Sequence, residues 1–160
     1  MVERDNPRFL RVVVAVRSAS PCAIHLVNQP LVVDRQLRVV WAPGPSMEQI
    51  GWLDALRMSR EFDLGGFHDW RLPTLRELQS IVIHELVDSE DPRASNVPIH
   101  SPFNRCNGGY IHSGAQVADC WFAPYILNVR NGHIFNGQGY RAYAWYVRTR
   151  NSGRPRPFGR

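Results

Sequence analysis

Alternating and β-branched apolar residues mark both ends of this chain as sheet-forming. Residues 9–16 (FLRVVVAV) predict a strand, and residues 31–41 (LVVDRQLRVVW) predict two short strands about a polar turn at positions 34–36. Toward the other end, residues 142–149 (AYAWYVRT) predict a closing strand. The N-terminal strand is left free to pair near this C-terminal strand.

A hairpin is predicted shortly before the closing strand. Apolar residues at 121–129 and 133–135 flank the pair Asn131-Gly132. Asn-Gly is the preferred pair in type I′ hairpin turns, where both residues take a positive φ. These positions therefore predict two antiparallel strands joined by a tight turn.

The middle of the chain changes from strand spacing to helix spacing. Ser46 is a suitable N-cap for a helix over residues 47–62, in which Ile50, Leu53 and Leu56 recur at helical spacing. The glycines at 65 and 66 are expected to end this first helix.

A second helix is predicted directly afterwards. Thr74 serves as its N-cap, and Glu77, three residues later, completes a capping box. The apolar stripe that this helix buries is expected at Leu75, Leu78, Ile81 and Val82.

Residues 88–114 are rich in proline, asparagine and glycine, so they predict a long loop. Together with the strands and helices, this indicates an α+β domain with two helices packed on antiparallel sheet, over residues 1–150. Residues 151–160 (NSGRPRPFGR) show no apolar periodicity and predict a flexible tail.

Composition narrows the choice of partners. The chain has 160 residues, a formal net charge of +5 and 19 basic residues, every one of them arginine. These arginines are scattered from Arg4 to Arg160 rather than clustered, which disfavours a nucleic-acid interface. Arg11 and Arg17 interrupt the first apolar run, so no signal peptide is visible and no segment is apolar enough to span a membrane. We expect a cytoplasmic protein by default, or alternatively a component of a cell-surface or virion assembly.

The segment GGFHDWRLPT at positions 65–74 concentrates the residue types that could carry chemistry. A catalytic interpretation would use His68 as a base and Asp69 as its orienting group, but sequence neighbours seldom hold that geometry and no nucleophile lies beside them. A structural interpretation explains more of the segment. Trp70 would fill the core between the two helices, while Asp69 and Arg71 pair or cap backbone groups nearby.

This segment also makes the chain recognisable. VVDRQLRVVW, WLDAL, LGGFHDWRLPTLRELQSIV and AWYVR, over about residues 31–150, resemble the bacterial family typified by the C-terminal domain of the Legionella collagen-like adhesin. Its specific signature corresponds here to Asp69, Trp70, Arg71, Pro73, Thr74 and Glu77. The resemblance implies a C-type-lectin-like fold and a surface or secreted binding module. It also implies a homo-oligomer, a trimer as in the adhesin itself, which recognises sulfated polysaccharides.

The sequence gives only weak signals for a metal or redox site. The six histidines lack the spacing of a zinc site, so we expect no metal and no cofactor. The three cysteines have no CxxC spacing. Enzymes related to the resembled fold use a cysteine pair, for which Cys106 and Cys120 are the candidates here. Buried or bridged cysteines are the favoured interpretation, and a cysteine-dependent oxidase would require both in one pocket.

Three functions remain. The leading one is a non-enzymatic module that binds a glycan or a protein through the 104–116 loop and the hairpin region. The second is a structural subunit of a larger complex, and the third is the oxidase. For the first, we predict a binding surface that combines aromatic faces with polar donors suited to anionic groups. Its residues are Arg130, Asn131, His133, Asn136, Tyr140, Arg141 and Tyr143.

Overall fold

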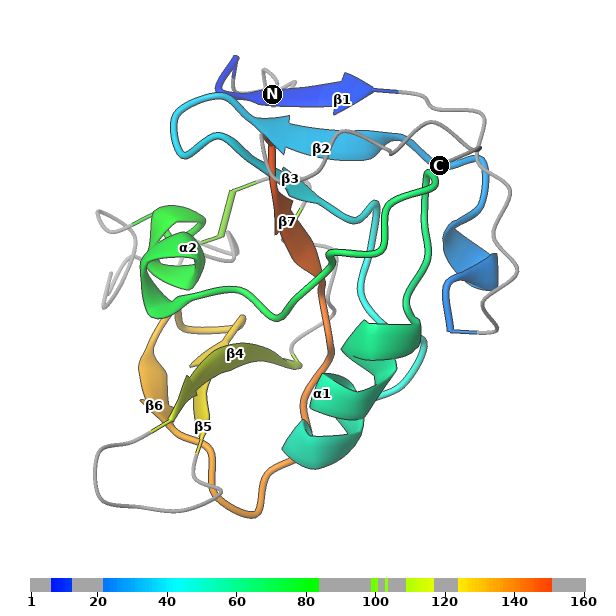
Figure 1. Cartoon of the computed structure of the whole chain (residues 1–160). Coiled ribbons are helices and arrows are strands. Elements are labelled where there is room, and N and C mark those ends of the chain that lie inside the picture. The colour runs from blue at the N-terminus through cyan, green and yellow to red at the C-terminus, as the bar shows by residue number, and fades with distance from the viewer. Residues whose placement is uncertain are drawn as a thin grey trace.

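The computed structural model describes residues 7–12, 22–83, 99–100, 103, 109–116 and 124–150. The predicted tail, Cys106, Cys120 and most of the 88–108 loop lie outside these residues. Within them the fold is α+β, as predicted, and contains two helices and two antiparallel sheets (Figure 1). The helices are α1 (Trp52–Glu61) and α2 (Leu75–Ser80), and a 3-10 turn spans Ile24–Leu26.

The first sheet has the strand order β1-β2-β3-β7. Its strands are β1 (Phe9–Val12), β2 (Leu31–Asp34), β3 (Val39–Trp41) and β7 (Val147–Thr149). The predicted β2 and β3 strands are confirmed, and the turn between them covers residues 35–38. The pairing expected for the N-terminal strand is wrong, because β7 pairs with β3 while β1 lies at the opposite edge of the sheet.

The second sheet has the order β4-β5-β6, with β4 (Tyr110–Gln116), β5 (Pro124–Asn128) and β6 (Ile134–Asn136). The prediction of a loop through residue 114 is wrong from Tyr110 onward, where β4 pairs with β5. Ile111, His112 and Ser113 are fully buried in this strand. The strand β4 thus forms because it packs against other elements, and the Gly-rich sequence around it does not predict a strand.

The β5–β6 hairpin is present, but its turn is not type I′. Gly132 has a φ of 77°, whereas Asn131 has no positive φ. The turn is closed instead by hydrogen bonds from the Gly132 amide to the Asn128 carbonyl (2.8 Å) and from the Asn128 amide to the His133 carbonyl (2.9 Å). Within the described residues, two consecutive positive φ angles occur at Gly65 and Gly66, at 70° and 76°, between the bridged residues Leu64 and Phe67.

The predicted start of the first helix is wrong by several residues. α1 begins at Trp52 after the N-cap Gly51, because Ile50 forms a bridge with Ala142 and the Ser46 hydroxyl accepts a hydrogen bond from the Ala144 amide. The buried face is also different, since Trp52 and Ala55 enter the core while Leu53 is exposed. The helix ends at Glu61, before the Gly65-Gly66 turn.

The predicted closing strand is shorter than its apolar pattern suggests. Before β7, residues 142–146 run beside residues 42–50 and are joined to them by separated hydrogen bonds, at Ala42, Ser46 and Ile50. Pro43 and Pro45 have no N–H to donate, so a continuous ladder cannot form along this segment.

A single core lies between these elements. Buried residues of the first sheet, including Trp41 and Val147, belong to the same cluster as Ile111 and Leu127 of the second sheet. Phe103 packs in this core against the first sheet and the segment before β7, with its ring 4.8 Å from Trp41 and 5.0 Å from Trp145. None of the helices in the described part of the chain has the length and apolar character needed to cross a membrane.

Candidate functional site

The GGFHDWRLPT segment connects both helices to the first sheet. Trp70 is 4% exposed, its indole N–H donates to the Leu64 carbonyl (3.2 Å), and its ring meets Phe62 edge to face at 5.5 Å. The backbone of Arg71 exchanges two hydrogen bonds of 2.8 Å with Val147 of β7. Trp70 and Arg71 thereby attach the α1–α2 connection to the core and to a sheet edge.

Two ion pairs strengthen this attachment. Arg148 is 3% exposed, contacts Asp69 at 2.8 and 3.2 Å, and lies over the Phe67 ring at 3.6 Å. Arg71 makes a bidentate pair with Glu77, at 2.6 and 2.9 Å. Asp69 and Arg71 are therefore engaged in contacts that hold the fold.

The capping box of α2 is confirmed. The Thr74 hydroxyl accepts from the Glu77 amide, and the Glu77 carboxylate accepts from the Thr74 amide (2.8 Å). Burial alone would raise the pKa of Glu77, but the hydrogen bonds from Arg71 and Thr74 outweigh it and hold this pKa below its usual value. The catalytic interpretation requires His68 to act as a base beside Asp69. His68 is exposed in this structure, and Asp69 is paired with Arg148.

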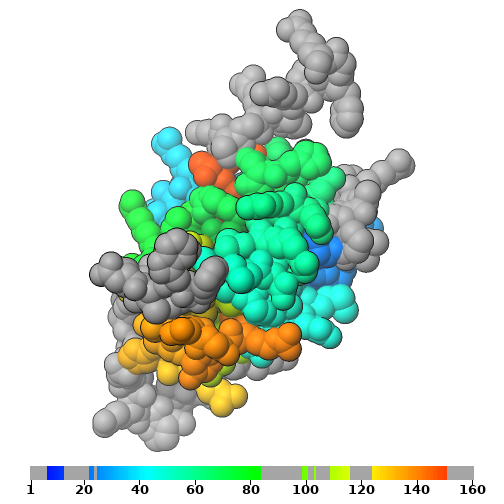
Figure 2. All heavy atoms as spheres, turned by 60° about the horizontal axis from the view of Figure 1, so that its bottom comes forward, coloured from blue at the N-terminus to red at the C-terminus, as the bar shows by residue number. Residues whose placement is uncertain are grey.

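The seven predicted binding residues lie along the β5–β6 hairpin and the segment after it. Arg130, Asn131 and His133 are exposed on the turn at one end of β6, and Asn136 is exposed at its other end. In the space-filling view the orange segment that follows β6 forms part of one face, beside the region of α1 (Figure 2). Along the chain, the predicted residues thus fall into a first group on the turn before β6 and a second group from Asn136 onward.

The second group is organised by aromatic rings. Tyr140 is 47% exposed and lies edge to face with Tyr110 (5.5 Å) and Phe135 (5.3 Å), which also contact each other at 5.7 Å. We call Tyr110, Phe135 and Tyr140 the aromatic cluster. Arg141 is exposed next to it in sequence, whereas Tyr143 is half-buried and faces the position where a Gly109 side chain would lie.

Sequence reasoning missed two members of this cluster. Tyr110 falls in the predicted loop and Phe135 in a predicted strand, and neither is among the seven predicted binding residues. Neither has a local signal for surface clustering, because they meet Tyr140 only when residues 137–143 fold back across the second sheet. The amides of His112 and Tyr143 make this connection by donating to the carbonyls of Tyr143 and Tyr110.

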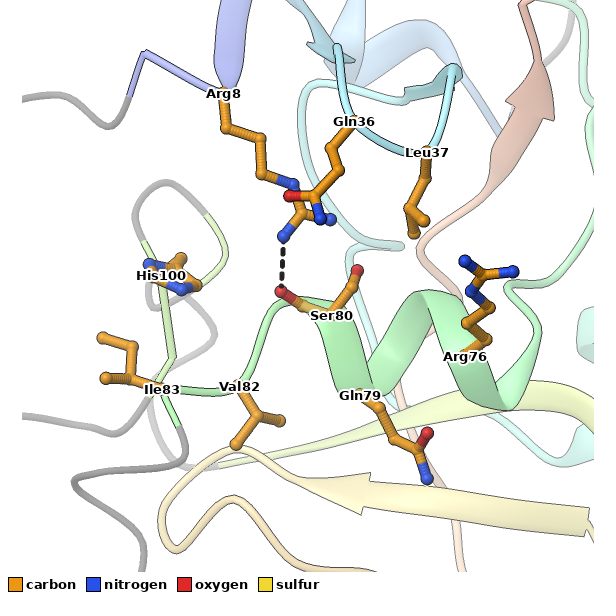
Figure 3. Close-up of a pocket in the computed structure, with 9 residues that line it drawn as sticks. All are labelled: Arg8, Gln36, Leu37, Arg76, Gln79, Ser80, Val82, Ile83 and His100. Carbon is orange, nitrogen blue, oxygen red and sulfur yellow. Dashed lines mark hydrogen bonds between the residues drawn. The ribbon is translucent and has the colours of Figure 1, made fainter.

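A separate hollow of about 480 Å³ lies between the β2–β3 turn and α2. Figure 3 shows Arg8 approaching it from just before β1, Gln36 from the β2–β3 turn and Arg76 from α2. We call it the arginine hollow, and its lining residues are Arg8, Gln36, Leu37, Arg76, Gln79, Ser80, Val82, Ile83 and His100. None of the seven predicted binding residues lines it, so it was not found from the sequence.

The other candidate chemistry is limited in the described part of the chain. Cys22 is half-buried, and its thiol donates to the Met58 carbonyl at 4.0 Å. Among the residues that the structure describes, no three His, Cys, Asp or Glu side chains are grouped so that they could hold a metal ion. The oxidase hypothesis concerns Cys106 and Cys120, which lie outside these residues.

Comparison with known proteins gives one family. The sequence model of the family described as the Lcl C-terminal domain matches residues 30–148, which include the GGFHDWRLPT segment, the hairpin and the aromatic cluster. Searches of the curated proteins and of the solved structures give no significant match.

Proposed function

The chain belongs to the Lcl C-terminal domain family, and from this membership we propose that it is a non-enzymatic recognition module with a C-type-lectin-like fold. The two helices and two antiparallel sheets around one core support that fold. The ionisable residues of the family signature support a non-enzymatic role. Asp69, Arg71 and Glu77 take part in ion pairs that hold the fold.

The observation that carries this proposal is the half-exposed aromatic cluster. A ring such as Tyr140 presents an apolar face with a polar hydroxyl, and it has few rotamers to lose when it binds. Its contacts with Tyr110 and Phe135 hold it in place before any ligand arrives. A preorganised aromatic face of this kind suits the apolar side of a sugar ring.

Polar groups next to the cluster suggest which glycans would bind. Asn136, Gln138 and Arg141 are exposed and lie close to Tyr140 in sequence, and Arg130 is exposed on the hairpin turn before β6. A guanidinium donates two parallel hydrogen bonds to a carboxylate or sulfate group. We therefore propose an anionic glycan as the ligand, with the sugar ring on Tyr140 and its anionic group at Arg141.

The test compares heparin oligosaccharide binding to the unmodified protein and to three variants: Tyr140→Ala, Arg141→Ala and the double variant Arg130→Ala with Arg141→Ala. Arg130 and Arg141 are exposed, so the arginine variants should keep the melting temperature of the unmodified protein. Tyr140→Ala loses two ring contacts and should lower the melting temperature modestly without unfolding the protein. We expect each variant to weaken binding by about tenfold or more, in line with the loss of a charge-assisted hydrogen bond or a stacked ring. Binding should also weaken with added salt.

Arg57→Ala is the matched control, because Arg57 is also exposed but lies on α1, where it pairs at the surface with Asp54. Equal losses in Arg57→Ala and Arg141→Ala would show that binding reflects net charge alone, which contradicts the proposal. A protein that copurifies in fixed proportion and binds independently of Tyr140 would favour the assembly role instead.

A further inference from the structure

The arginine hollow is distinct from the aromatic cluster and has its own chemistry. We propose that it binds an organic carboxylate joined to an apolar group, such as a free small acid or the C-terminal residue of a peptide. The proposal depends on three features of the lining: guanidinium groups, side-chain amides and an apolar wall (Figure 3).

The first guanidinium is held rigidly. Arg8 makes a bidentate pair with Asp34 at 2.9 and 2.7 Å, and its third donor bonds the Ser80 carbonyl at 3.2 Å. Asp34 is completely buried and also accepts from the amides of Gln36 and Leu37. Arg8 therefore neutralises the Asp34 carboxylate and donates a hydrogen bond to the Ser80 carbonyl at the end of α2, so neither acceptor opposes an anion in the hollow.

The second guanidinium is available for a ligand. Arg76 is exposed on α2, lines the hollow, and makes no ion pair or hydrogen bond with any residue that the structure describes. Figure 3 shows its side chain directed toward the β2–β3 turn, which carries Gln36 and Leu37. A carboxylate could accept both hydrogen bonds of the Arg76 fork, with the Gln36 amide as a further donor.

The surrounding charges favour the same ligand. No Asp or Glu lines the hollow. Arg35 and Arg38 are exposed in the same β2–β3 turn, which adds positive charge near the opening. A site with unbalanced positive charge attracts anions and raises their local concentration.

The apolar part of the lining decides between kinds of anion. Leu37, Val82 and Ile83 make up a third of the nine lining residues and have no polar side-chain atoms to offer. A small, fully hydrated inorganic anion would leave this wall unused, whereas an acid with a branched aliphatic group would cover it. The combination favours a carboxylate with an apolar body over free phosphate or sulfate.

The experiment titrates the intact protein with N-acetyl-leucine and follows backbone amide shifts by NMR. We expect saturable shifts at Leu37 and along α2, without shifts at Tyr140, and a dissociation constant on the order of 1 mM. N-acetyl-leucinamide, which lacks the charge, should bind at least about tenfold more weakly. A peptide that ends in leucine with a free carboxylate distinguishes the two sources, since tighter binding than N-acetyl-leucine would indicate a peptide C-terminus.

Arg76→Gln should weaken N-acetyl-leucine binding by about tenfold or more, while glutamine preserves the helix because its propensity is close to that of arginine. Arg57→Gln, which makes the same charge change on α1, should have no effect. The proposal is overturned if the amide binds as well as the acid, if Arg76→Gln binds normally, or if no saturable shift appears around the hollow. Heparin binding at Tyr140 is measured separately, so the two sites can fail independently.

Discussion

At the scale of single residues, Trp70 gives the strongest evidence that the family signature stabilises the fold. Its ring is buried against Phe62 and its indole N–H is satisfied by the Leu64 carbonyl. Trp70→Ala should lower the free energy of unfolding by ~3–5 kcal/mol, a large part of the ~5–15 kcal/mol that a domain usually has. Urea denaturation measures this loss. A variant that kept its unfolding midpoint but lost glycan binding would contradict the structural interpretation.

His112 predicts how stability depends on pH. It is fully buried, its Nε2 lies 2.7 Å from the Ile50 carbonyl, and its Nδ1 has no hydrogen-bond partner among the residues that the structure describes. Burial lowers the pKa of His112 below its usual 6.5, although the hydrogen bond with Ile50 acts in the opposite direction. The carbonyl requires an Nε2–H donor, so a second proton would occupy the unpartnered Nδ1 in the core.

The direction of the effect follows from proton binding. Below pH 6.5 the unfolded chain protonates this histidine while the folded protein does not, so acid favours unfolding. His112 should contribute a stability loss of up to about 1.4 kcal/mol for each pH unit, from pH 6.5 down to its folded-state pKa. Urea denaturation between pH 7 and about pH 5 should show a flatter pH dependence for His112→Gln. The exposed control His133→Gln should keep the original slope, and equal slopes in all three proteins would disprove the assignment.

At the scale of elements, pairing across the chain overrode several local patterns. The ten-residue α1 starts late because residues 46–50 are bonded to residues 142–144. The ladder of residues 142–149 is interrupted because its partner segment contains Pro43 and Pro45. By contrast, α2 begins where predicted, since Thr74 and Glu77 satisfy each other within one helical turn.

At the scale of the whole molecule, the two sheets should unfold together. Ile111 and Leu127 of the second sheet pack in one cluster with Trp41 and Val147 of the first. We expect tryptophan fluorescence and far-ultraviolet circular dichroism to give the same urea midpoint. Ile111→Ala should lower both midpoints equally, by a loss of ~2–5 kcal/mol. Two separate midpoints would show that the sheets are independent units.

The sequence by itself determined the features that depend on neighbouring residues. These are the α+β class, the β2 and β3 strands, the capping box of α2, the burial of Trp70 and the family signature around it. Each is specified within a few residues, by alternation, helical spacing or a side chain that bonds the backbone three positions away. The exposed hairpin residues could be located in the same way. Their grouping in space could not be predicted from the sequence.

Only the tertiary structure decided which distant residues share a surface. The aromatic cluster requires β4, β6 and residues 137–143 to fold over one another, and the Gly-rich sequence before Tyr110 does not indicate β4. The arginine hollow joins Arg8 to Asp34 and Ser80, which are 26 and 72 positions away. Such contacts form because a shared core brings the elements together and a buried carboxylate must then find a partner. No local pattern of residues encodes that choice of partner.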